Sequence, residues 1–136
     1  DFLYELEKTS MSKSYKIPTL LSLVEDGLLQ QNASLNKVGL SFMNFYRNEK
    51  MHQKDLNNKR HKNWEEWGHE KFIKEAKRNP VKYLCKRKYF IFDEINDKFM
   101  LNKELHKYLD ENLTKHFQDI LEFRKVRYFR RRFKDN

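Results

Sequence analysis

The sequence predicts a mainly α-helical domain that contains one β-hairpin. Only three glycines and two prolines occur among the 136 residues. So few turn-forming residues argue against an all-β fold and against a disordered chain. Eleven Phe and seven Tyr residues can build a core although hydrophobic residues make up only 38% of the chain. The length fits one domain over residues 1–136.

The N-terminal third of the chain is predicted to form helices and one short strand. Residues 1–11 have the pattern of a short amphipathic helix, a candidate tail of a preceding segment. The first main helix is expected over Tyr15–Asp26, with Gly27 as its C-terminal cap. Leu28–Gln31 is extended and predicts a small strand. A second helix is expected over Ser34–Tyr46, with its first residue as the N-cap and apolar residues at helical spacing: Leu35, Val38, Phe42, Phe45 and Tyr46.

The middle of the chain is expected to be an insertion followed by a helix. Residues 47–63 are polar and basic and predict an irregular or partly helical segment. A helix is expected over Glu70–Arg78, which would complete an insertion of residues 47–78. Asn79 then has the residue type of an N-cap, and Pro80–Arg87 is predicted as a new helix that begins with proline.

The C-terminal third carries the one clear β signal and the longest helix. Tyr89–Leu101 predicts a hairpin because two β-branched or aromatic runs flank a turn-like segment. Asn102 is expected to cap a helix that ends at Leu109. A long helix is predicted over Thr114–Phe133, and its apolar residues cover more than a single stripe: Phe117, Ile120, Leu121, Phe123, Val126, Phe129 and Phe133.

The order of these elements is that of a winged helix-turn-helix: helix, short strand, helix, helix and hairpin. The predicted fold is therefore a winged-helix-like core that contains the 47–78 insertion and ends in a long C-terminal helix. In such a core Pro80–Arg87 would precede the wing, Tyr89–Leu101. A helix of this kind fits the major groove of DNA, and the wing can contact the neighbouring backbone.

The net charge of +9 is concentrated in two blocks. Residues 51–92 carry twelve basic and five acidic groups, and residues 114–136 carry eight and three. Residues 93–113 lie between them and carry three basic and six acidic groups. Such segregation is typical of polyanion binding. A solvated lysine-rich surface is the alternative interpretation.

The basic blocks supply the candidate nucleic-acid contacts. Arginine binds phosphate through a planar fork of donors, and an aromatic side chain can stack on an unpaired base. The C-terminal run interleaves both residue types, with Tyr128 as a candidate stacking residue. DNA is favoured over RNA as the partner. The candidate binding residues are Lys54, Lys59, Arg60, Lys62, Lys82, Lys86, Arg87, Lys88, Arg124, Arg127, Arg130, Arg131 and Arg132.

A protein-interaction or assembly module is the alternative function. Asp93, Glu94 and Asp97 would place negative charge at the tip of the wing and repel phosphates. The aromatic segments, among them Tyr89–Phe92, would then dock on other domains of a parent protein or on a second copy of the chain. Trp64 and Trp67 are three residues apart and are expected to pack rather than to stack on bases.

No motif of the sequence predicts catalysis or metal binding by this chain alone. A glycine-rich phosphate loop and a serine-centred elbow are absent, and the five His residues lack paired spacing, so no cofactor and no metal are expected. Cys85 is the single cysteine, which excludes an internal disulfide and favours a reducing, cytoplasmic location. No apolar run is long enough to cross a bilayer, so no membrane partner is expected.

Five segments carry a resemblance to a known group of proteins: Glu7–Leu21, Phe42–Tyr46, Ala76–Leu84, Ile120–Arg124 and Tyr128–Phe133. They resemble the accessory regions that follow the helicase motor in bacterial restriction and phage-defence helicase–nuclease proteins. They span most of the chain and consist of core and basic positions without a catalytic signature. The resemblance implies an accessory DNA-binding domain of a larger protein, whose helicase and nuclease motifs would lie outside this sequence.

Overall fold

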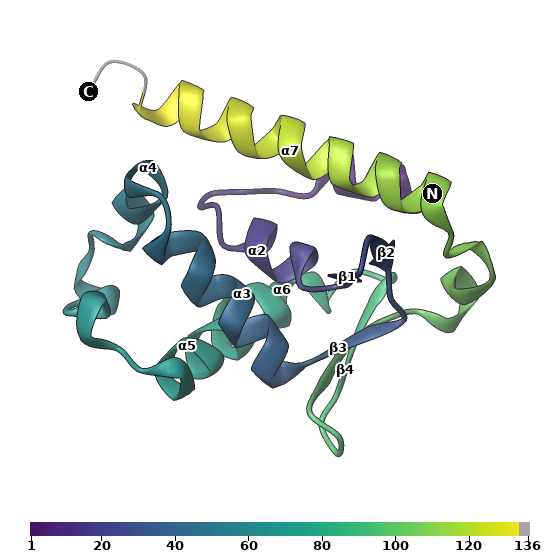
Figure 1. The fold of residues 1–136 in the computed structure, drawn as a ribbon, viewed down its shortest axis with the longest axis horizontal. Coiled ribbons are helices and arrows are strands. Elements are labelled where there is room, and N and C mark those ends of the chain that lie inside the picture. The colour runs from purple at the N-terminus through teal and green to yellow at the C-terminus, as the bar shows by residue number, and fades with distance from the viewer. Residues whose placement is uncertain (134–136) are drawn as a thin grey trace.

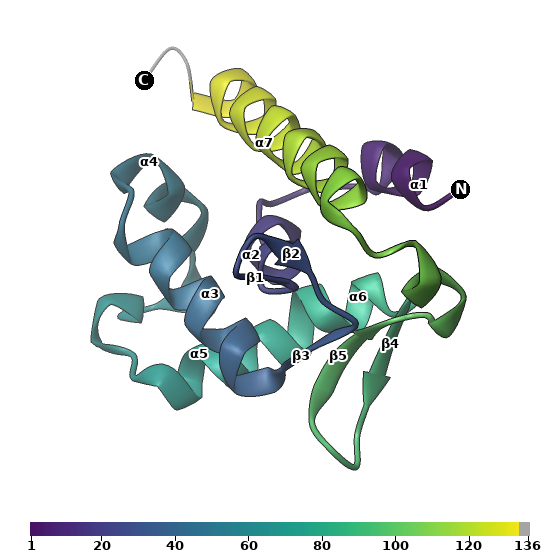
Figure 2. The same ribbon diagram turned by 45° about the vertical axis from the view of Figure 1, so that its right-hand side comes forward.

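A computed structural model describes residues 1–133 and shows a mainly helical chain with two small antiparallel sheets (Figure 1). The long helix α7 lies across one side of the molecule, and the short helix α1 runs beside it (Figure 2). The helices are α1 (Phe2–Lys8), α2 (Lys16–Leu21), α3 (Leu35–Arg47), α4 (Lys50–Gln53), α5 (His69–Ala76), α6 (Lys82–Leu84) and α7 (Glu111–Phe133).

A three-stranded sheet joins the N-terminal and C-terminal halves. Its strands are β3 (Asn32–Ser34), β4 (Phe90–Asp93) and β5 (Lys98–Leu101), in the order β3-β5-β4. The predicted hairpin is therefore confirmed. The predicted strand Leu28–Gln31 is confirmed over Leu28–Leu29, which form β2. Strand β2 pairs with β1 (Val24–Glu25) in a separate sheet, and it is β3 that pairs with β5.

The predicted first helix is too long, and the role expected of Gly27 is wrong. Helix α2 ends at Leu21, and the chain turns at Asp26 and Gly27 between β1 and β2. Both turn residues have positive φ, 52° and 77°. A two-residue hairpin turn of this kind needs positive φ at both positions, which Asp-Gly supplies at low cost.

One helical rod replaces the two helices predicted between residues 70 and 87. Helix α5 passes into a π-helical turn, Lys77–Val81, and then into α6. The prediction that Asn79 caps a new helix is wrong. Pro80 lies inside the wider turn, where an i→i+5 hydrogen-bond pattern tolerates a residue without an N–H group. The insertion therefore ends before α5, which packs closely on α3 where Gly39 meets Ile73.

The other helix predictions are close to the observed bounds. Ser34 caps α3 by accepting a hydrogen bond from the backbone N–H of Lys37. Asn102 caps a 3-10 helix, Lys103–Tyr108, rather than an α-helix. The insertion consists of α4 and three 3-10 turns, Lys54–Leu56, Lys59–His61 and Trp64–Glu66. Helix α7 contacts α1, α2, α4 and β2, as its broad apolar set predicted.

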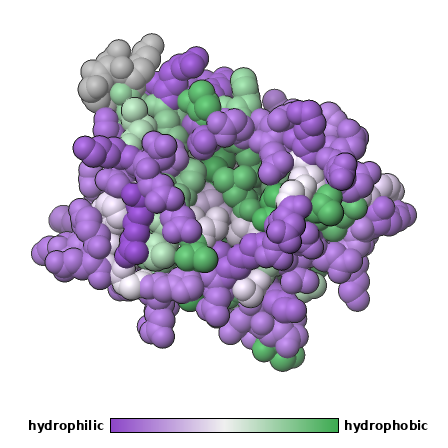
Figure 3. Space-filling model, in the orientation of Figure 1, coloured by the Kyte–Doolittle hydropathy of each residue, from purple (hydrophilic) through white to green (hydrophobic). Residues whose placement is uncertain are grey.

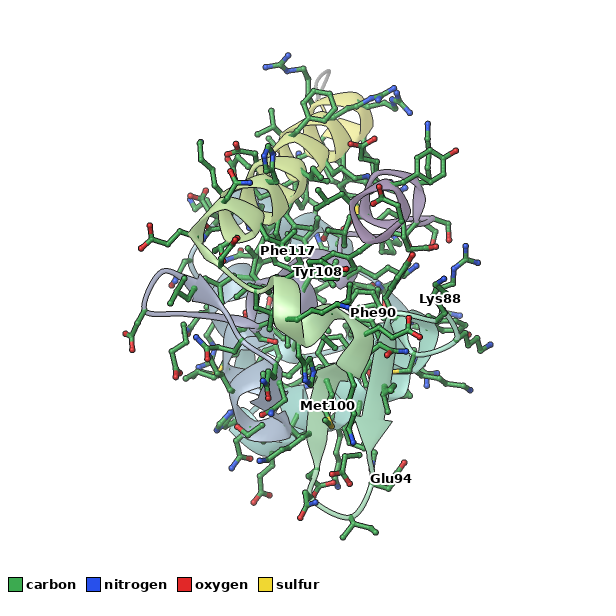
Figure 4. All side chains as sticks on the ribbon, turned by 90° about the vertical axis from the view of Figure 1, so that its right-hand side faces the viewer. Lys88, Phe90, Glu94, Met100, Tyr108 and Phe117 are labelled. Atoms are coloured by element: carbon green, nitrogen blue, oxygen red, sulfur yellow. The ribbon has the colours of Figure 1, made fainter. Side chains whose placement is uncertain are left out.

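An aromatic cluster holds α1 in the core. Phe2 stacks on Phe117 of α7 at a centroid distance of 6.1 Å and lies within 6.0 Å of Phe90 of β4. Figure 4 shows Phe90 and Phe117 in the interior, while Glu94 lies at the tip of the hairpin. Because Phe2 and Leu6 are buried, residues 2–8 contribute to the core of this domain. Figure 3 shows a mostly hydrophilic surface with hydrophobic side chains gathered beneath α7.

A buried carboxylate, Asp55, ties three distant segments together. Its oxygens accept hydrogen bonds from the backbone N–H and hydroxyl of Ser14, at 2.9 and 2.6 Å, and from the hydroxyl of Tyr128, at 2.8 Å. Its backbone carbonyl accepts a hydrogen bond from the Tyr15 hydroxyl. Burial, followed by this hydrogen bond to a carboxylate, raises the pKa of Tyr128, so the phenol stays a donor.

A second buried carboxylate, Glu75, fixes the α5 rod against the insertion. Arg78 donates two hydrogen bonds to it, at 2.8 and 2.6 Å, and Nε2 of His61 lies 2.7 Å from Oε2. Burial alone would raise the pKa of Glu75, but the hydrogen bonds with Arg78 and His61 outweigh burial and lower the pKa from 4.5 to about 2. The charged form of Glu75 is therefore the one that the fold stabilises.

Replacing Asp55 is expected to destabilise the whole domain. Asp55→Ala leaves the donors of Ser14 and Tyr128 buried without an acceptor and should lower the free energy of unfolding by about 3 kcal/mol. Asp119→Ala, which removes an exposed carboxylate, should change it by less than about 0.5 kcal/mol. Urea unfolding followed by circular dichroism measures both values. Equal midpoints for the two variants would contradict the structural role of Asp55.

Stability is expected to fall in acid in a way that depends on Glu75. A lowered folded-state pKa gives stability that is fully present above 4.5 and is lost as the pH falls toward about 2. The linkage amounts to at most about 3 kcal/mol. Urea midpoints measured from neutral pH downward should show this loss in the wild type and a flatter profile in Glu75→Gln. The profile of exposed Glu66→Gln should match the wild type, and a Glu75→Gln profile that also matched it would exclude the linkage.

Candidate nucleic-acid interface

The outer side of the rod formed by α5, the π turn and α6 is basic. Its buried residues, Phe72, Ala76 and Leu84, face the core. The exposed residues of the rod and of the turn directly after it include four lysines, which we call the rod lysines: Lys71, Lys74 and Lys82 on the rod, and Lys86 in the turn. Of these, Lys82 and Lys86 were predicted from sequence. Lys71 and Lys74 were missed, because the predicted helix Glu70–Arg78 was assigned to the insertion and not to the helix that precedes the wing.

An exposed aromatic ring lies among the lysines at the C-terminal end of the rod. The Nζ atoms of Lys82 and Lys86 lie 5.9 and 4.6 Å from the ring centroid of Tyr83, which is 44% exposed. The same ring lines a hollow of about 340 Å³ together with Asn79 and with residues between α1 and the start of α2: Ser10, Ser12, Lys13, Tyr15 and Lys16. Basic side chains thus surround a ring that solvent can reach.

The hairpin beside the rod uses its acidic residues internally. The Asp93 carboxylate accepts hydrogen bonds from the backbone N–H groups of Ile95 and Asn96 and from the side-chain amide of Asn96. The Asn96 side-chain bond contributes most to lowering the pKa of Asp93. Glu94 lies 3.3 Å from Nζ of Lys77 in the π turn. The Lys77 contact therefore offsets the charge of Glu94, whereas the contacts of Asp93 favour its charged form, so part of the negative charge predicted at the tip of the hairpin is retained.

Two predicted residues at the base of the hairpin differ in their surroundings. Arg87 donates to both carboxylate oxygens of Glu5, at 2.9 and 3.3 Å, so its charge is already paired with α1. Lys88 is exposed, and its Nζ lies 5.1 Å from the ring centroid of Tyr89. Figure 4 shows Lys88 on the outer side of the molecule, near the start of the hairpin.

Two of the predicted arginines on α7 make contacts within the fold. Arg124 donates to the carbonyl oxygens of Leu6 and Thr9, at 3.0 and 2.6 Å, and so caps the C-terminal end of α1. Burial, followed by the nearby charge of Arg127, lowers the pKa of Arg124. Arg132 donates to the carbonyl of Ser12 at 3.2 Å and lies 4.0 Å from Asp55.

The remaining arginines of α7 are exposed, and they divide between two sides of the helix. Arg127 and Arg131 line a groove beside α1, whereas Arg130 lies outside that lining. Within residues 1–133, the side chains of these three arginines make no hydrogen bond and no ion pair. Their charges are thus available to an external anion.

The predicted basic residues of the insertion lie on the segment that precedes the rod. Lys59, Arg60 and Lys62 are exposed on or beside the second 3-10 turn of the insertion. Lys54 is half-buried, and its Nζ lies 5.0 Å from the ring centroid of Phe133 on α7. Trp64 is buried, and Trp67 packs edge-on against Phe72. Both tryptophans therefore pack within the domain.

The described residues hold no cluster suited to metal chemistry. No group of three or more His, Cys, Asp or Glu side chains lies close enough to bind a metal ion in residues 1–133. Burial raises the pKa of the Cys85 thiol to about 12, so the thiol stays protonated at neutral pH. Within the same residues, every helix is too short or too polar to cross a lipid bilayer.

Comparisons with known proteins give no further guide to the family. Protein-family models, curated proteins and solved structures were each compared with the chain, and none of them matches it.

Proposed function

We propose that this chain is a winged-helix DNA-binding accessory domain that contacts backbone phosphates through its basic helices. The observation that carries the proposal is the basic outer side of the α5–α6 rod, which lies beside a hairpin where Glu94 is paired with Lys77 and Asp93 is hydrogen-bonded within the turn. A rod of this kind has the dimensions to enter the major groove of a DNA duplex.

The topology supports the winged-helix assignment. Helices α2, α3 and the α5–α6 rod supply three helices in the expected order. Strand β3 lies between the first two and pairs with β5, and β4 forms the outer strand of the hairpin. The insertion into the winged-helix order is then limited to the segment between α3 and α5. This segment is shorter than the predicted insertion, residues 47–78.

The distribution of charge supports a polyanionic partner. The rod lysines are exposed, and their positive charges would be attracted to a phosphate backbone. Duplex DNA offers a phosphate every few ångströms along each strand, so several of these lysines could be neutralised together. The resemblance to restriction and phage-defence helicase–nuclease proteins suggests a parent protein that acts on DNA, and it stays a prediction.

An assembly module is the second candidate function. Several large hydrophobic side chains are exposed, among them Leu28 of β2 and Leu40 of α3, at 40% and 42%. Figure 3 shows hydrophobic side chains gathered on the face that contains α3, beneath α7. Contact with another domain of a parent protein, or with a second copy of this chain, would cover such a surface.

Neutralising two rod lysines is expected to weaken duplex binding. In Lys74→Ala/Lys82→Ala the affinity for a labelled DNA duplex should fall for every sequence tested, because phosphate contacts are lost. The slope of log affinity against log salt should become shallower by about 1.8, which is about 0.9 for each contact. Fluorescence anisotropy across a salt series measures both quantities.

The matched control is Lys103→Ala/Lys107→Ala, which removes two exposed lysines from the 3-10 helix that follows β5. This variant should keep most of the wild-type affinity and slope. Equal losses in the two variants would point to nonspecific attraction by net charge. Absence of duplex binding at low salt would exclude the proposed function and leave the assembly module, which sedimentation of the purified chain can test.

A further inference from the structure

A groove of about 850 Å³ separates α7 from α1 and the loop that follows α1. This volume lies within the range of about 300–1,000 Å³ that is common for sites that bind small organic molecules. Figure 2 shows α1 beside α7, where the two walls of the groove originate. The lining residues are Glu7, Lys8, Met11, Asp119, Ile120, Phe123, Arg124, Arg127, Tyr128, Arg131 and Arg132.

The groove combines positive charge with an exposed aromatic ring. Five of its lining residues are basic, and two are acidic. Phe123 is 64% exposed, whereas Phe117 and Phe129 on the same helix are buried. An exposed Phe loses the burial energy that its ring could provide, so a ligand that covers the ring would recover this energy.

The helical spacing places the ring and the arginines in one row. Phe123, Arg127 and Arg131 are four residues apart, so their side chains follow one another along the same side of α7. The interactions of Arg124 with the end of α1 hold the two walls together. The groove is therefore a preformed feature of the fold, with a flat apolar ring and two arginines in one row along its α7 wall.

We propose that the groove between α1 and α7 binds a single strand of nucleic acid, with a base stacked on Phe123 and the neighbouring phosphates on Arg127 and Arg131. An unpaired strand presents both a free base face and a regular series of phosphates, and this pair of features matches the row on α7. A duplex keeps its base faces stacked, and an acidic peptide lacks the regular alternation of ring and phosphate. This proposal rests on the proposed nucleic-acid binding and adds a second surface to it.

The groove and the hollow beside the rod are bordered by the same loop of the chain. The segment between α1 and α2 contributes Met11 to the groove and Ser12 and Lys13 to the hollow that contains Tyr83. The two hollows therefore border the same short loop. A nucleic acid with a duplex part on the rod and an unpaired part in the groove would pass over this loop, which suits a junction between duplex and single strand.

The test compares Phe123→Ala with wild type on labelled oligonucleotides of about eight nucleotides, within the size of known single-strand sites. Phe123→Ala should bind an oligothymidine strand about tenfold more weakly. It should bind an abasic strand of equal length and a DNA duplex as the wild type does. Phe123→Trp should keep the affinity for the single strand, because stacking is preserved.

Matched substitutions on the same helix distinguish binding in the groove from nonspecific attraction by net charge. Arg131→Ala should weaken single-strand binding, whereas Arg130→Ala, which removes an equal charge outside the groove, should have a smaller effect. Val126→Ala removes an exposed apolar side chain outside the groove and should leave the affinity for the single strand unchanged. Circular dichroism of each variant checks that the fold is retained.

Three results would overturn this proposal alone. Equal affinity of Phe123→Ala and wild type for oligothymidine would exclude stacking, even if duplex binding persisted and the proposed function stood. Equal losses in Arg130→Ala and Arg131→Ala would place the contact outside the groove. Binding of polyglutamate that also depends on Phe123 would assign the groove to an acidic peptide. A fourth result, absence of binding by the wild type to both single strands and duplexes, would exclude this proposal and the proposed function together.

Discussion

The carboxylate of Asp55 is the constraint that fixes how α7, the insertion and the loop before α2 are arranged. It is fully buried, and its acceptor positions are occupied by groups from the loop before α2 and from α7. A buried charge without such donors would carry a large desolvation cost. The insertion therefore cannot move away from α7, and the position of α7 in turn fixes the groove wall that carries Phe123.

Positive charge in this protein serves two different purposes. Arg78 and Arg124 stabilise the fold, because one pairs with a buried carboxylate and the other caps the end of α1. Arg127, Arg131 and the rod lysines are directed to solvent. A count of basic residues in the sequence treats both groups alike, and only the contacts distinguish a structural arginine from one that an external anion can reach.

The helices and the hairpin could be predicted from sequence because their signals are local. Ser34 and Asn102 were identified as caps, and the apolar spacing of α3 matched its buried side. The apolar set predicted for α7 matched only in part, because Phe123 and Val126 are exposed. The rod could not be predicted, because Asn79 and Pro80 have the residue types of a helix start, and only packing against α3 favours continuation through a π turn. Lys71 and Lys74 were missed because their predicted helix, Glu70–Arg78, was assigned to the insertion and not to the helix before the hairpin. Pairings over long range, such as β3 with β5 or Arg124 with α1, leave no local pattern.

The π turn in the rod has a consequence for helical phase. A π turn accommodates one extra residue, and this residue offsets the rotation of the following helix by roughly 100° relative to a regular α-helix. Without this offset, Phe72 and Leu84 would point about 120° apart, and one of them would leave the core. With it, the two residues share a side, and Lys74 and Lys82 share the opposite one. The extra residue at Pro80 thus keeps the inside and the outside of the rod in register over its whole length.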